Sequence, residues 1–487
     1  MDWIQQHWFI LLLLLGYTAI LAHHAWVGSR GTKQLDDYYV GGRTMGGITI
    51  GLSFFATYSS TNSFVGFAGQ SYLYGTPWLL MAPAVVGFSL LAWLWVAPRL
   101  RHFTGTLGSL TIPDFIGFRF ASRTARITAA MIVIFASALY VTAIFKGIAN
   151  TLEAFLSLSY GTVIWIVFVI VVIYTAVGGF ISVVKTDAVQ GLIMVVAAGV
   201  LFLGTVRGSG GLGSIFELPE TEYAGHLFSW DAAMPFPVLL GIIFAATIKF
   251  IVEPRQLTRF YALKDKTALR QGTWVSTFAF TVVYSMLVPI GLYAQKIFPG
   301  EFTDSDRIVP ALLTDPAFFH PTLSGLVLLA LIAAAMSSLD SVLLVMASTC
   351  HRDLLEPWTR NVTGHYAVRA TRWYVLLFAF ICTLIALDPP GSIVRLTAFS
   401  GSLYAACFFP TLILGLYWRR GNGTAVTASF LTGLAVLLLW EHLEIHTGIH
   451  EVFPAIFLST LVFVVLTWFL PSTISKEVED SFRSLHA

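Results

Sequence analysis

The chain contains thirteen long apolar stretches, and these limit the folds it can adopt more than any other feature of the sequence. Each is long enough to cross the hydrocarbon core of a bilayer as an α-helix, which takes about 20 residues. Of the 487 residues, 56% are hydrophobic and only 11% are charged, values that soluble globular domains do not reach. We therefore predict an all-α, polytopic membrane protein. The predicted spans are residues 8–27, 47–72, 77–98, 124–156, 160–181, 183–206, 236–262, 271–297, 322–350, 370–388, 396–418, 422–440 and 451–471.

Basic residues are distributed unevenly over the loops between these spans. Of the 28 Lys and Arg residues, 22 lie on one predicted side of the membrane: in the odd-numbered gaps, in the C-terminal tail, or in the span ends that adjoin these segments. The remaining six, which lie in even-numbered gaps or inside spans, are Arg207, Lys296, Arg307, Arg395, Lys146 and Lys249. Because basic loops stay in the cytoplasm, we predict that the N-terminus is outside and the C-terminus inside.

Polar residues interrupt two of the predicted spans. The second span contains a polar run at residues 57–63, and the seventh contains Glu253 followed by Pro254. A broken helix exposes backbone groups that are tolerated in a membrane only where they face a cavity or other protein. Two interrupted spans five apart, each opening a set of five helices, are typical of the inverted repeats of secondary transporters.

This pattern divides the chain into six predicted units. Two inverted repeats of five helices each are flanked by a leading helix and by two trailing helices. The units are residues 1–46 (first helix and cytoplasmic loop), 47–206 (repeat 1), 207–235 (external loop), 236–419 (repeat 2), 420–471 (two trailing helices) and 472–487 (cytoplasmic tail).

The ninth span carries polar side chains along one helical face. Ala334, Ser337, Ser338 and Ser341 are spaced i, i+3, i+4, i+7, and Asp340 lies beside them. A carboxylate near the middle of a bilayer costs about 2.5–3.5 kcal/mol, so it requires a partner or a cavity. Hydroxyl and carboxylate oxygens suit a hard cation. The alternative for the serines is close helix packing, which small residues also favour.

Seven sequence motifs are distributed along the chain: YTAVGGFIS (174–182), KTDAVQ (185–190), AAAMSSLDS (333–341), DDYYVGGRTMGG (36–47), SLTIPDFIGFRF (109–120), PRQLTRFYA (254–262) and FSGSLYAACFFPTLILGLYW (399–418). They resemble motifs of the sodium:solute symporter family, the group that includes sodium/proline, sodium/pantothenate, sodium/sialic acid and sodium/glucose transporters, and the last of them is the looser match. The resemblance covers residues 1–471 and implies the LeuT-like fold of two inverted five-helix repeats.

The resemblance implies two cation sites. Sodium, the coupling ion and the only metal expected, would be bound by the backbone carbonyls of Ala56, Ser59 and Ala334 and by the hydroxyls of Ser337 and Ser338. The second site, which only some members have, would use Asp187, Ser337, Asp340 and Ser341. Asp340 stands where two-sodium members have serine, so it could instead carry a proton. Asp187 could alternatively pair with Lys185 or with a loop arginine.

The solute is expected next to the break in the second span, near the middle of the membrane. The candidate residues are Tyr58, Asn62, Ser63, Gln70, Lys146, Glu253 and Arg255. Lys146 could alternatively pair with Glu253 or Asp340, whereas Lys249 is close enough to the inner end of its span to extend to the interface. Lys146 and Arg255 together weakly favour a solute that bears a carboxylate.

These observations predict a plasma-membrane transporter (an inner-membrane protein if the source is bacterial) that couples sodium entry to uptake of a small organic solute. It would use no cofactor, perform no enzymatic chemistry, bind no nucleic acid, and act as a monomer or loose oligomer in the lipid bilayer. The alternatives are a proton-coupled carrier of the same fold, a sugar or vitamin symporter, and a solute sensor or leak channel.

Overall fold

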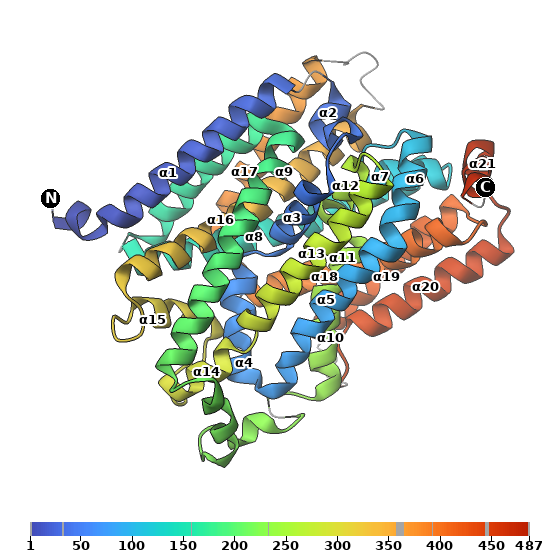
Figure 1. The fold of residues 1–487 in the computed structure, drawn as a ribbon. Coiled ribbons are helices and arrows are strands. Elements are labelled where there is room, and N and C mark those ends of the chain that lie inside the picture. Colours follow the sequence, from blue (N-terminus) through green and yellow to red (C-terminus); the bar gives the residue numbers. More distant parts are fainter. Residues whose placement is uncertain are drawn as a thin grey trace.

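The computed structural model describes residues 2–31, 34–156, 158–231, 233–356, 365–391, 393–443 and 448–485. These residues form helices and no β-strand, as predicted (Figure 1). Eleven helical segments are long and apolar enough to cross a membrane. They are Trp8–Gly28, Thr76–Leu107, Arg123–Glu153, Thr175–Gly208, Phe236–Ala262, Lys266–Ile297, Pro321–Leu355, Tyr366–Leu387, Ile393–Tyr417, Gly423–His442 and Val452–Phe469.

The two remaining predicted spans contain shorter apolar helices, Gly47–Tyr58 and Tyr160–Val171. The first is short because the helix breaks where the polar run begins. The second belongs to α9 (Tyr160–Gly208), a 49-residue helix that covers both the fifth and the sixth predicted span. The count of thirteen spans and the orientation of the termini therefore stay predictions.

A single glycine allows α9 to bend without a loop. Gly179 has φ +64° and ψ −173°, a conformation that side-chain-bearing residues avoid. A Cβ atom at this position would lie 2.6 Å from Cδ2 of Tyr38, which belongs to α2 (Leu35–Val40). The glycine therefore provides both the backbone conformation and the space that α2 needs.

Both predicted helix breaks are present. Helix α3 (Gly47–Tyr58) ends as Ser59 becomes extended, a π-helical turn follows at Asn62–Phe67, and the chain continues as α4 (Ala68–Tyr74). In the seventh predicted span, α10 (Phe236–Thr247) and α11 (Lys249–Val252) end at Glu253, which is extended. Pro254 then opens α12 (Pro254–Ala262), because proline disfavours helical geometry in the residue before it but fits the first helical position.

Helix α16 (Pro321–Thr349) lies at the centre of the bundle. It contacts α1, α3, α8, α9 and α17, and it is buried along almost its whole length. Helices α19 and α20 lie on the side opposite α1 and pack against each other and against α18 (Figure 1). The other helices are α1 (Asp2–Gly31), α5 (Met81–Leu91), α6 (Ala97–Leu107), α7 (Ile112–Arg119), α8 (Arg123–Leu156), α13 (Lys266–Leu287), α14 (Ile290–Ile297), α15 (Ile308–Thr314), α17 (His365–Leu387), α18 (Ile393–Tyr417), α19 (Gly423–His442), α20 (Val452–Phe469) and α21 (Lys476–Ser484).

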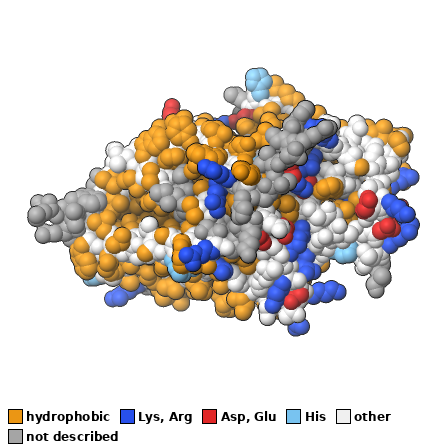
Figure 2. All heavy atoms as spheres, turned by 90° about the horizontal axis from the view of Figure 1, so that it is seen from above, with side chains coloured by type: hydrophobic (Ala, Val, Ile, Leu, Met, Phe, Trp, Pro, Cys, Tyr) orange, Lys and Arg blue, Asp and Glu red, His pale blue; other side chains and the backbone are white. Residues whose placement is uncertain are grey.

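The end of the molecule that carries α2 and α6 is the predicted cytoplasmic end. Figure 2 views it and shows groups of Lys and Arg side chains on it. Helix α21 packs on α6 at the same end.

Replacing Gly179 by alanine should lower the stability of the protein. The backbone strain alone costs about 1–3 kcal/mol, and the new methyl group would also press against Tyr38. Gly199→Ala, in the same helix with no other atom within 4 Å of the new methyl, is the matched control and should be neutral or stabilising by about 0.5–1 kcal/mol. Melting temperatures of the purified variants test this, and equal values for the two variants would contradict it.

Candidate functional site

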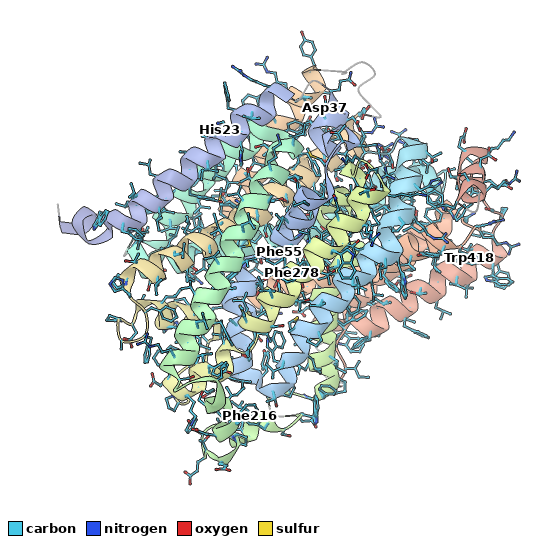
Figure 3. All side chains as sticks on the ribbon, in the orientation of Figure 1. His23, Asp37, Phe55, Phe216, Phe278 and Trp418 are labelled. Carbon is cyan, nitrogen blue, oxygen red and sulfur yellow. The ribbon has the colours of Figure 1, made fainter. Side chains whose placement is uncertain are left out.

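The break in α3 brings a backbone carbonyl of this helix against the polar face of α16. The Ser337 hydroxyl lies 2.9 Å from the Ala56 carbonyl oxygen and 2.9 Å from that of Ala334. All three residues are fully buried. Figure 3 labels Phe55, which precedes Ala56 in the chain. Phe55 lies between Asp37, near one end of the molecule, and Phe216, near the other. Three oxygens of the expected sodium site thus lie together, between the two ends of the molecule.

The two other residues of the expected sodium site have different neighbours. The Ser338 hydroxyl donates to the Thr57 carbonyl at 3.1 Å, and the Ser59 hydroxyl lies 3.4 Å from the hydroxyl of Tyr284. Thr57 was not predicted as a site residue, although it opens the polar run that marks the break. Its carbonyl also accepts a hydrogen bond from Nη1 of Arg255 at 2.7 Å.

Asp187, expected in the second cation site, forms a buried ion pair with Arg259 of α12. The Arg259 Nη2 atom lies 2.8 Å from Oδ2 of Asp187, 2.6 Å from Oγ of Ser341 and 2.7 Å from Oγ1 of Thr57. Ser53 donates to the same carboxylate oxygen at 2.6 Å. The guanidinium group therefore lies among the oxygens that the sequence had grouped as a cation site. The sequence prediction omitted Arg259, because it lies near the end of a predicted span, where arginine is ordinary.

Asp340 lies at the edge of this cluster. It is fully buried, and the Ser341 hydroxyl lies 3.3 Å from its Oδ1 atom. Ser341 also donates to the Ser337 carbonyl at 2.7 Å. Ser341 thus contacts Ser337 and Asp340 directly, whereas it is linked to Asp187 through the shared Nη2 of Arg259.

A central cavity adjoins the break in α3. Five of the seven predicted solute residues line it: Tyr58, Asn62, Ser63, Gln70 and Arg255. The other lining residues are Ser60, Phe67, Trp78, Tyr140, Ile242, Ala246, Lys249, Val394, Thr397 and Ala398. Glu253 and Lys146 do not belong to this lining.

Two cations approach the ring of Tyr140 in this cavity. The guanidinium carbon of Arg255 lies 4.1 Å from the ring centroid, and Nζ of Lys249 lies 4.7 Å from it. Glu253 pairs with Arg255 through an Nε–Oε1 contact of 2.7 Å. Lys249 donates to the Thr397 carbonyl at 2.8 Å.

The structure corrects the expectations for both lysines inside spans. Lys249 does not extend to the interface: it is only 4% exposed, because α11 turns its side chain toward the cavity and α18. Lys146 pairs with neither Glu253 nor Asp340. Its Nζ donates to the Gly391 carbonyl at 2.9 Å, and its charge acts on Asp306. The sequence did not reveal these partners because each depends on how a helix is rotated.

A second cavity, of about 620 Å³, lies on the predicted outer side of the first. Gln70, Ile242, Val394 and Ala398 line both cavities and therefore separate them. Asp304 and Asp306 also line the outer cavity. Burial, reinforced by the Asp304 carboxylate, raises the pKa of Asp306 to about 6, whereas the Lys146 ammonium opposes this rise. The outer cavity thus extends from the predicted outer side to the layer of shared residues that separates it from the central cavity.

The sequence pattern of the Sodium:solute symporter family matches residues 38–433. This chain belongs to that family. As a member, it is a multi-pass plasma-membrane transporter and not an enzyme. The resemblance seen in its motifs is thereby confirmed over most of the chain, and sodium is the coupling ion that the family supports.

Curated relatives match this sodium:solute symporter along nearly their whole length. The osmoregulated proline transporter OpuE of Bacillus subtilis is 30% identical over 474 residues, which are 94% of this chain and 93% of OpuE. The sodium/pantothenate symporter of Haemophilus influenzae is 27% identical, with 93% of this chain and 94% of that protein covered.

Solved structures support the LeuT-like fold of this symporter. A Na⁺-coupled sialic acid symporter in a substrate-bound, outward-open state matches with a TM-score of 0.82 at 18% identity, over 95% of this chain and 98% of that one. MhsT in complex with L-phenylalanine matches with a TM-score of 0.53 at 12% identity, over 88% and 98% of the two chains. At these identities the likeness shows the fold alone.

Removing one partner of the Asp187–Arg259 pair should strongly destabilise the protein. Asp187→Asn leaves the Arg259 guanidinium buried without its counter-charge, which costs about 3–5 kcal/mol, whereas the double variant Asp187→Asn/Arg259→Gln should recover part of that loss. Asp304→Asn is the control, because the exposed Asp304–Arg307 pair should contribute no more than about 1 kcal/mol. Melting temperatures report the effect. If the stability loss of the double variant equals the sum of the losses in Asp187→Asn and in Arg259→Gln, the two residues are not coupled.

Proposed function

We propose that this protein is a sodium-coupled symporter that takes up a small organic solute bearing a carboxylate, by alternating access. The single observation that carries the proposal is the adjoining placement of the Ala56–Ala334–Ser337 oxygens and the cation-lined central cavity at one helix break. Sodium bound to these oxygens would hold α3 against α16, and solute in the cavity would contact the same break. Each ligand would therefore raise the affinity for the other.

The sodium would use the carbonyls of Ala56, Ser59 and Ala334 and the hydroxyls of Ser337 and Ser338. The proximity of three of these five oxygens supports the assignment. Hydroxyl groups that donate to carbonyls can rotate, and would then offer their lone pairs to a bound ion. We infer that Ser338 makes this change from its bond to Thr57.

The second cation site of Asp187, Ser337, Asp340 and Ser341 stays a prediction. A second cation would have to displace Nη2 of Arg259 from Asp187 and Ser341. We therefore propose that one sodium at the first site drives transport. Uptake coupled to protons through Asp340 is the second candidate, which the full burial of this carboxylate favours.

The energy available from one sodium ion is sufficient for concentrative uptake. Entry of one charge releases about 2.3 kcal/mol per 100 mV, and a tenfold sodium gradient adds about 1.4 kcal/mol. A neutral solute could thus be concentrated several hundred-fold. With a monovalent anion, the inward movement of negative charge would cancel the electrical part. The sodium concentration gradient alone would then drive uptake, and each tenfold sodium gradient would allow about a tenfold accumulation of the solute.

The carboxylate preference is supported by the charges of the cavity. Arg255 lines the cavity beside Asn62 and Ser63, at the same break as the sodium site. The units 47–206 and 236–419 would be the two inverted repeats, with the second supplying Arg255 and the first supplying the α3 carbonyls.

Uptake by proteoliposomes should depend on a sodium gradient and not on a pH gradient of the same size. Proline, pantothenate, lactate and glucose are suitable first solutes, each measured with either gradient alone. Uptake that ignores sodium but follows the pH gradient would replace the proposal by the proton-coupled candidate. Binding without concentrative uptake would favour a sensor or a leak channel.

Ser337→Ala and Ser338→Ala should each weaken the apparent sodium affinity about tenfold or more, because each removes one ion ligand, equivalent to about 1.4 kcal/mol or more. Ser324→Ala is the matched control on α16, since its hydroxyl donates to the Leu313 carbonyl, away from the site. Sodium titration of uptake measures the change. Wild-type affinity in both variants would exclude these serines from the site.

A further inference from the structure

We infer that Lys249 makes the central cavity specific for an organic anion without an ammonium group, in preference to a zwitterionic amino acid. This inference rests on the proposed function and names the class of solute more narrowly. It assigns to Lys249 a role in specificity that neither the motifs nor the comparisons give it.

The first support is the charge balance of the cavity. Lys249 and Arg255 line it and are 4% and 1% exposed. Glu253 is the described acid whose charge acts on both, and its Oε1 accepts from Arg255. One positive charge in this group is therefore left without a counter-charge deep in the membrane, where such a charge is costly.

The second support is the position of the Lys249 ammonium. Among the described residues, its hydrogen-bond acceptor is the Thr397 carbonyl, and the Tyr140 ring lies 4.7 Å away. Both partners are neutral. An ammonium has three donors, so this group retains the capacity to bind an anion that enters the cavity. Gly401 lets α18 approach the Lys249 side chain closely, since a Cβ atom at residue 401 would lie 2.7 Å from Cε of Lys249.

The third support is that the described cavity lining offers an amine no counter-charge. No acidic residue belongs to the described lining of the cavity. The Thr57 carbonyl, at the break where an ammonium could bind, already accepts from Arg255 at 2.7 Å and from Ser338 at 3.1 Å. An ammonium group would also be repelled by both cations.

Two amide oxygens of residues that line the cavity, Asn62 Oδ1 and Gln70 Oε1, are buried without a hydrogen-bond partner in the structure and indicate a neutral polar group on the solute. Gln70 is 97% buried, lines the cavity, and has an Oε1 atom without a hydrogen-bond partner in the structure. The Nε2 atom of Gln70 donates to the Ser305 hydroxyl at 3.3 Å, so Oε1 of the same amide points away from Ser305. A hydroxyl or amide N–H of the solute would satisfy this oxygen. The expected class is therefore a hydroxylated or amide-containing monocarboxylate.

Isosteric pairs of compounds test the inference on the purified full chain in sodium buffer. Three sets differ in charge but little in shape: tetrahydrofuran-2-carboxylate against proline, lactate against alanine, and pantothenate against pantothenol. Thermal-shift titration should give at least one anion an apparent affinity at least tenfold above that of its partner. If in every set the zwitterionic or neutral member binds as well as the anion, or no anion binds, the inference is wrong.

Variants of Lys249 complete the test. Lys249→Met should reduce the anion preference at least tenfold, and Lys249→Arg should keep most of it. Lys264→Met, at an exposed lysine, is the control and should leave the preference unchanged. An unchanged anion preference in Lys249→Met would overturn the role of this residue. If Lys249→Met does not fold, loss of the anion preference in Lys249→Arg would overturn that role equally. Anion preference without sodium-dependent uptake would instead contradict the proposed function and leave the inference standing.

Discussion

The hydrogen bond from Arg255 to the Thr57 carbonyl joins the two broken helices, and the rest of the site depends on it. A membrane offers no water to satisfy the backbone groups that a helix break exposes. In this protein the guanidinium group from the second break satisfies a carbonyl of the first. The same carbonyl also accepts from Ser338, so α3, α12 and α16 meet at one oxygen atom. A movement of any of these helices must change the hydrogen bonding of the other two.

The parts of this architecture that depend on local composition could be predicted from the sequence. Apolar runs of sufficient length defined the spans, the polar run at 57–63 and the Glu253–Pro254 pair located both breaks, and the spacing of Ser337, Ser338 and Ser341 gave the polar face of α16. The motifs added the family and the identity of the ion. These features need no knowledge of how helices pack against one another.

The contacts made by long basic side chains could not be predicted in the same way. Lys249, Lys146 and Arg259 each extend several ångströms from the backbone, and their partners lie on helices distant in sequence. Whether Lys249 points to the interface or to the cavity depends on the rotation of α11, which is only four residues long and has no periodicity of its own. Arg259 was overlooked because it lies near the end of a span, where arginine is ordinary.

The thin layer between the two cavities has a consequence for the kinetics of transport. Gln70, Ile242, Val394 and Ala398 line both cavities, so the barrier on the outer side is about one side chain thick. The inner side is closed by α12, all of whose residues are buried, and by the hydrogen bond from Tyr261 to the Thr111 carbonyl. Rotation of a few side chains takes nanoseconds, whereas displacement of a packed helix takes microseconds to milliseconds. Solute should therefore exchange rapidly with the outside, and opening toward the inside should limit the turnover rate.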